Sequence, residues 1–113
     1  MRIAPLSLAL VLAAVSWAGS ASAQSAPSAE CRRDLLVADS LVLKSRDRLL
    51  AAANATLAVQ CPVWRDHVEA ARKASAIHGR CSKGPERVRI QAELDETASD
   101  FAAQVKSRCK GAL

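Results

Sequence analysis

The segment CPVWRDHVEAARKASAIHGRCSKGP, residues 61–85, predicts a helix with a cysteine near each end. Its inner face is formed by residues that recur every three or four positions: Trp64, Val68, Ala71, Ala74 or Ser75, and His78 or Ile77. Pro62 suits the first helical position, where the N–H that proline lacks would have no partner. Gly79 suits the left-handed cap that ends many helices. We therefore expect a helix that starts at Cys61-Pro62 and stops at Gly79.

The preceding residues, 30–60, predict a first helix. One face repeats with a 4-3-4-3 spacing and contains Cys31, Leu35, Ala38, Val42, Ser45, Leu49, Ala52 and Thr56. Ser28 can cap this helix, and Glu30 places a negative charge in its first turn. We expect the helix to end between residues 58 and 60, with Asn54 and Thr56 as weak points within it.

The residues that follow predict a third helix after a turn at residues 82–85. Pro85 again suits a helix start. One face of this helix carries Ile90, Leu94, Thr97 or Ala98, Phe101 and Val105, and Cys109 extends it. Short connections make neighbouring helices antiparallel, so the order of the three helices is up-down-up.

Four cysteines, at positions 31, 61, 81 and 109, lie near the ends of these helices. A disulfide spans only about 5.5 Å between Cα atoms, so each bridge must stay at one end of the bundle. Only the pairing Cys31–Cys81 with Cys61–Cys109 meets that condition. We therefore predict an all-α, up-down-up three-helix bundle stapled by two disulfides. The first helix is then longer than the second, so it must be bent, broken near Asn54 or overhanging.

The N-terminal residues have the three parts of a secretory signal peptide. A positive start at Arg2 precedes an apolar stretch, and Ala21 and Ala23 supply a small-x-small end. We predict a signal peptide over residues 1–23 cleaved before Gln24, a flexible lead over 24–29 and the helical domain over 30–113. The apolar stretch is short for a membrane span of about 20 residues, so we expect no transmembrane segment after cleavage. Export to a periplasm or to the outside also fits an even cysteine count.

Four leucines repeat every seven residues beside the inner face of the first helix: Leu36, Leu43, Leu50 and Leu57. One interpretation is the seam of a helical homodimer. A dimer seam needs a second apolar row, and the neighbouring positions include Asp39, Arg46 and Asp47 instead. We therefore expect the leucines to widen the core face and the chain to be a monomer.

Residues that could carry catalysis or bind a metal are few. His67 and His78 lie about three helical turns apart, roughly 16 Å, which is too far for one metal ion. Glu93, Asp95, Glu96 and Asp100 form an acidic belt that we interpret as a solvated face, paired with Arg72 and Lys73 of the second helix. The sequence has no phosphate-binding glycine loop. We expect no enzymatic activity, no catalytic residues, no cofactor and no metal.

The charge pattern is the sharpest functional feature, in a chain with a formal net charge of +5. If Cys31 pairs with Cys81, one end of the bundle gathers six cations: Arg32, Arg33, Arg80, Lys83, Arg87 and Arg89. The opposite end gathers Arg65, Lys106, Arg108 and Lys110. Such ends could bind anionic envelope polymers, lipid head groups or acidic proteins by electrostatic attraction. Nucleic acid is not expected, since no aromatic residues alternate with the cations.

The function predicted from the sequence is a non-enzymatic exported protein that binds a partner or has a structural role in the cell envelope. The alternatives are an anion binder that uses the arginine-rich ends and a homodimer that uses the leucine edge.

Overall fold

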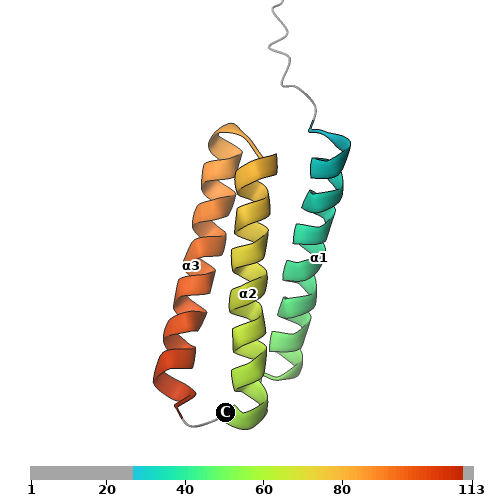
Figure 1. The fold of residues 1–113 in the computed structure, drawn as a ribbon. Helices are drawn as coiled ribbons and strands as arrows, with labels where there is room; N and C mark the ends of the chain where they lie inside the picture. The colour runs from blue at the N-terminus through green and yellow to red at the C-terminus, as the bar shows by residue number, and fades with distance from the viewer. Residues whose placement is uncertain (1–26, 111–113) are drawn as a thin grey trace, which may run out of the picture.

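The computed structural model describes residues 27–110, which form three helices joined by short turns. They are α1 (Ala29–Ala51), α2 (Leu57–Cys81) and α3 (Gly84–Arg108). The helices run antiparallel side by side, with α2 between the other two (Figure 1). The predicted signal peptide and its cleavage site lie outside the described residues. None of the described helices is long and apolar enough to cross a membrane.

Helix α1 begins after Ser28, whose side chain accepts a hydrogen bond from a backbone N–H that has no partner within the helix. Ser28 Oγ accepts a hydrogen bond from the Cys31 backbone N–H at 3.1 Å, and Glu30 lies in the first turn. An N-cap of this kind stabilises a helix by about 1 kcal/mol. The prediction of this cap is confirmed.

The same helix ends earlier than the predicted residues 58–60. It stops at Ala51, and a turn leads to Thr56, whose extended backbone precedes α2. The Gln60 side-chain amide donates to the carbonyls of Ala52 and Ala53, at 3.1 and 3.0 Å. The predicted first helix is therefore broken near Asn54, which was one of the three possibilities considered from the sequence. As a result, α1, α2 and α3 have similar lengths of 23, 25 and 25 residues.

Two predicted boundaries of α2 are wrong. The helix starts at Leu57, so Pro62 lies inside it rather than at its first position. It also continues to Cys81, so Gly79 does not end it. Gly79 instead lies against α3, where a Cβ would come within 2.6 Å of Nε2 at the end of the Gln91 side chain, so that side chain would have to move.

The start of α3 confirms the predicted role of proline, which lies in the first turn. The turn before it depends on Gly84, which has a φ of 62°. That left-handed conformation is costly for residues with a side chain.

Two disulfides tie the bundle at opposite ends, in the predicted pairing. Cys31 joins Cys81 with a Cα–Cα distance of 5.2 Å, and Cys61 joins Cys109 at 5.8 Å. All four cysteines are bonded. The chain is therefore an all-α, three-helix bundle held by two disulfides.

The core is thin and centres on α2. Most of the buried residues belong to α2, whereas α1 buries only Ala38 and Ser45 within its length, and α3 only Ala98. Small side chains at these contacts let the helices approach closely. Helices α1 and α3 each pack on α2, but no Cα atom of one comes within 8 Å of the other in the described chain. On the side of the bundle away from α2, the backbones of α1 and α3 are therefore not in contact.

Candidate functional site

A row of exposed leucines runs along α1. Leu36, Leu43 and Leu50 are 69%, 59% and 77% exposed. The prediction that these leucines widen the core is wrong, because no other helix covers their side of α1. Leu57 does not continue the row on the same helix, since it begins α2. We call Leu36, Leu43 and Leu50 the leucine row.

A groove of about 370 Å³ separates α1 from α3 next to this row. Its apolar lining includes Val42 from α1 and Ile90 and Leu94 from α3. Leu43 also lines it, so the row and the groove form one continuous surface. The charged residues of the groove are Asp39, Arg46 and Glu93. An apolar surface with charges beside it is typical of sites where proteins bind other proteins.

His67 connects all three helices inside the bundle. Its side chain is 4% exposed, and Nδ1 lies 2.7 Å from Ser45 Oγ on α1. On the other side its ring meets the ring of Phe101 on α3 edge-on, with centroids 4.6 Å apart. Burial, with a smaller contribution from Arg46, holds the pKa of His67 below its ordinary value. We interpret His67 as a packing residue, neutral at pH 7.

His78 is half-buried near the other end of α2. Its Nδ1 lies 2.8 Å from Ser82 Oγ, and the residue borders the groove. Within residues 27–110, no group of three His, Cys, Asp or Glu side chains is placed to hold a metal ion.

The acidic belt on α3 is solvated, as predicted: Glu93, Asp95, Glu96 and Asp100 are all exposed. Glu93 pairs with Arg89 on its own helix at 3.2 Å. Asp95 accepts a hydrogen bond from Ser75 Oγ on α2 at 2.7 Å. The expected pairing with Arg72 and Lys73 is wrong, since no salt bridge in the described chain joins either residue to the belt.

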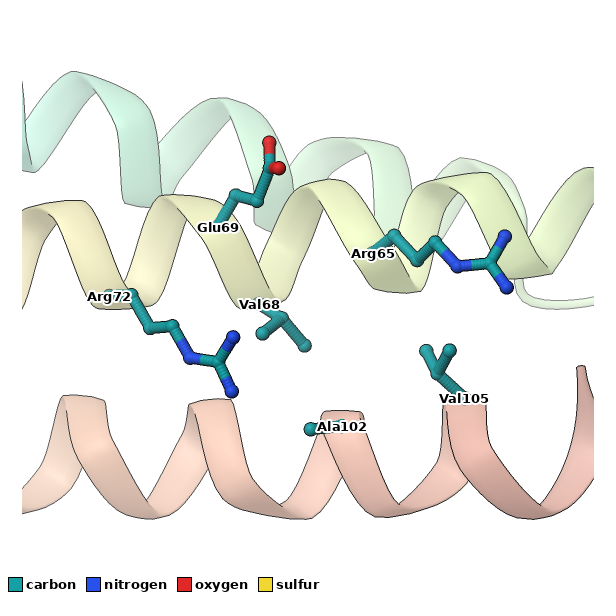
Figure 2. A pocket seen from close by; sticks show the side chains of 6 residues that line it. All are labelled: Arg65, Val68, Glu69, Arg72, Ala102 and Val105. Atoms are coloured by element: carbon teal, nitrogen blue, oxygen red, sulfur yellow. The ribbon is translucent and has the colours of Figure 1, made fainter.

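A small hollow lies between α2 and α3 (Figure 2). Val68, Ala102 and Val105 form its apolar part, and the Arg72 side chain points across it toward α3 while the Glu69 carboxylate points away. Its volume is about 250 Å³, and pockets that enclose small molecules range from about 300 to 1,000 Å³. The hollow is thus too small to define a ligand class.

The structure brings together the six predicted cations at the end closed by Cys31–Cys81. This end contains the start of α1, the end of α2 and the start of α3 (Figure 1). All six are exposed: Arg32, Arg33, Arg80, Lys83, Arg87 and Arg89. Arg80 is paired with Asp34 at 3.4 Å. The side chains of Arg33 and Arg87 form no hydrogen bond or salt bridge within the described residues.

At the opposite end, which is closed by Cys61–Cys109, one of the predicted cations packs on an aromatic ring. The guanidinium of Arg108 lies over the Trp64 ring, 5.2 Å from its centroid. Sequence reasoning missed this contact, although both residues lie near the cysteines of the second disulfide. This contact places one of the four cations of the second end against the core.

These features define a class by architecture alone, a disulfide-stapled three-helix bundle with an open apolar face. No protein-family model, curated protein or solved structure matches the chain.

Proposed function

We propose that this chain is a non-enzymatic, exported binding module that docks a helix of another protein chain on the outer face of α1. The observation that supports it most directly is the exposure of Leu36, Leu43 and Leu50 at 69%, 59% and 77%. Disulfides form and persist in oxidising compartments, which supports export to a periplasm or to the outside. The proposal excludes a catalytic role for His67, which is buried and engaged with Ser45.

The spacing of the row suits a helical partner. Leucines seven residues apart rise about 10.5 Å along α1, and they interlock best with another helix that repeats at the same interval. The neighbouring groove supplies further apolar contact through Val42 and Leu94. Burying a leucine fully contributes about 1.5–3 kcal/mol, so covering this face gives a clear gain.

Site-specific crosslinking in the exported compartment tests the proposal. A photo-reactive residue in place of Leu43 is expected to yield a discrete crosslinked product. The matched control is the same residue in place of Val88, which is 64% exposed on α3 and lines neither the groove nor the row. Equal, diffuse labelling at both positions would contradict a docking face on α1.

A second candidate function is the binding of anionic envelope polymers, lipid head groups or acidic proteins at the Cys31–Cys81 end. It is supported by the convergence of cations from three segments, with Arg33 and Arg87 exposed and without a side-chain partner among residues 27–110. Exposed charges act over about 10 Å at moderate salt, so a cluster attracts an anionic surface more strongly than scattered cations do.

Vesicles with and without anionic lipid test this second function. Binding to the anionic vesicles is expected to weaken steeply with added salt and to fall in the double variant Arg33→Glu, Arg87→Glu. The control Arg72→Glu alters an exposed arginine in the middle of α2 and is expected to change binding much less. Binding that ignores both salt and the double variant would rule out this function.

A further inference from the structure

We infer that the helix docked on the leucine row is α1 of a second copy of this chain, packed antiparallel about a twofold axis at Leu43. This inference rests on the proposed function, because it names the partner of the same face. It replaces the expectation of a monomer with a symmetric dimer.

The leucine row is symmetric about its centre. Leu36 and Leu50 each lie seven residues from Leu43. A twofold axis at Leu43 therefore places Leu36 opposite Leu50 of the second copy and Leu43 opposite its own equivalent. Such a twofold contact is self-complementary and closes with two chains. A parallel pair would also align the leucines, so the leucines alone do not set the direction.

The charges beside the row favour one direction over the other. The flank toward the groove carries Arg32, Asp39 and Arg46, and the other flank carries Arg33, Ser40 and Asp47. In an antiparallel pair related by this axis, like flanks meet. Asp39 then lies level with Arg46 of the second copy, and Arg46 with Asp39 of the second copy. On the other flank Asp47 meets Ser40, so no like charges are opposed.

A parallel pair would bring the two different flanks together. Arg32 would then lie level with Arg33 of the second copy, and Arg46 with Asp47 of the second copy, each twice in the dimer. The attraction between Arg46 and Asp47 is then offset by the repulsion between the arginines, whereas the antiparallel pair has the attraction without the repulsion. The charge pattern therefore favours the antiparallel dimer.

The two residues that would form these contacts are available in the single chain. Asp39 and Arg46 are exposed, and neither forms a salt bridge within the described residues. They lie on one flank of α1 about 10.5 Å apart along the helix, which is too far for them to pair with each other. Contact with a second copy gives each of the two residues a partner of opposite charge.

The seam consists of one apolar row, so it buries less than the roughly 1,600 Å² of a standard stable interface. We therefore expect a dimer that dissociates roughly in the micromolar range.

Sedimentation equilibrium of the disulfide-bonded chain, from below to above that range, tests the inference. The wild type is expected to change from one chain mass to two. Leu43→Asp is expected to remain one chain mass, and its circular-dichroism spectrum should match that of the dissociated wild type because Leu43 is exposed. The matched control Val88→Asp is expected to dimerise like the wild type.

A charge exchange tests the direction. Asp39→Arg turns two attractive contacts into two repulsive ones and is expected to weaken the dimer about tenfold. The double variant Asp39→Arg, Arg46→Asp restores both pairs with their signs exchanged and is expected to recover the wild-type affinity. Failure of the double variant to recover would overturn the antiparallel arrangement.

The two proposals fail in different ways. A wild type that stays at one chain mass at every concentration overturns the self-association. If the residue-43 crosslink then joins the chain to a different protein, the docking function stands with another partner. If that crosslink also fails, the docking function itself is overturned.

Discussion

Three polar side chains, Ser45, His67 and Ser75, are buried in the described part of the chain, and each bonds across to a neighbouring helix. Ser45 on α1 meets His67 on α2, and Ser75 on α2 donates to Asp95 on α3. A buried polar group without a partner costs about 1–3 kcal/mol. These pairs therefore favour one alignment of the helices along their axes. The small alanines of the core would by themselves permit the helices to shift relative to one another.

Ser45 Oγ lies within hydrogen-bond distance of two groups, the Val42 carbonyl at 3.0 Å and His67 Nδ1 at 2.7 Å. The hydroxyl has one proton to donate and can also accept, so it pairs with His67 Nδ1 in either tautomer of the neutral ring.

We predict that the stability of the protein falls as the pH drops through 6.5. That is the ordinary pKa of histidine, and burial followed by Arg46 lowers the pKa of His67 in the fold. Between the two pKa values the unfolded chain binds a proton that the folded chain does not, so acid favours unfolding there. Below the folded-state pKa the effect levels off.

Urea denaturation of the wild type and of His67→Gln, at pH values on both sides of 6.5, measures this effect. The variant is expected to lose most of the slope of unfolding free energy against pH. Arg46→Gln is expected to reduce the slope and not abolish it, because burial remains the larger cause. An unchanged slope in His67→Gln would contradict the prediction.

At the scale of the elements, the α2–α3 contact depends on a glycine inside a helix. Gly79 leaves room for the Gln91 side chain, whose Nε2 donates to the Ser75 carbonyl at 3.1 Å. Glycine in a helix interior costs about 1 kcal/mol relative to alanine. The hydrogen bond and the close approach of α3 offset that cost.

A double-mutant cycle tests this account. In a Gln91→Ala background, Gly79→Ala is expected to stabilise the protein by about 1 kcal/mol, because the space is then open. In the wild-type background the gain is expected to be smaller or absent, since Gln91 must move and lose its bond to Ser75. Denaturant titration of the four proteins gives both values, and equal gains would show that Gln91 does not require the glycine.

At the scale of the whole molecule, the two disulfides constrain the chain almost equally. They close loops with sequence separations of 50 and 48 residues, one at each end of the bundle. Because the core is thin, the disulfides take over part of the role that apolar burial has in larger domains.

We predict that removing either disulfide costs about 4 kcal/mol, the value that loop closure gives for loops of this size. The measurement compares the unfolding free energy of Cys31→Ser, Cys81→Ser with that of Cys61→Ser, Cys109→Ser. Both double variants are expected to lose similar amounts. A loss at one end several times that at the other would show that local packing, not loop closure, sets their effect.

Much of the architecture could be predicted because it depends on local properties. Helical periodicity, the Ser28 cap and Pro85 located helices, and the short reach of a disulfide selected Cys31–Cys81 and Cys61–Cys109. The ends of α1 and α2 could not be placed, since the early break depends on Gln60 bonding to carbonyls seven and eight residues back. The role of Gly79 was misjudged because only the packed α3 shows that this position borders the Gln91 side chain.

The sequence by itself determined that this chain is helical, how its cysteines pair and which cations share an end. Only the tertiary structure decided that the leucine row faces outward. Periodicity tells which residues share a side of a helix, but the width of the covered side depends on where the other helices pack. Here α3 packs on α2 and leaves α1 open, so Leu36, Leu43 and Leu50 remain exposed.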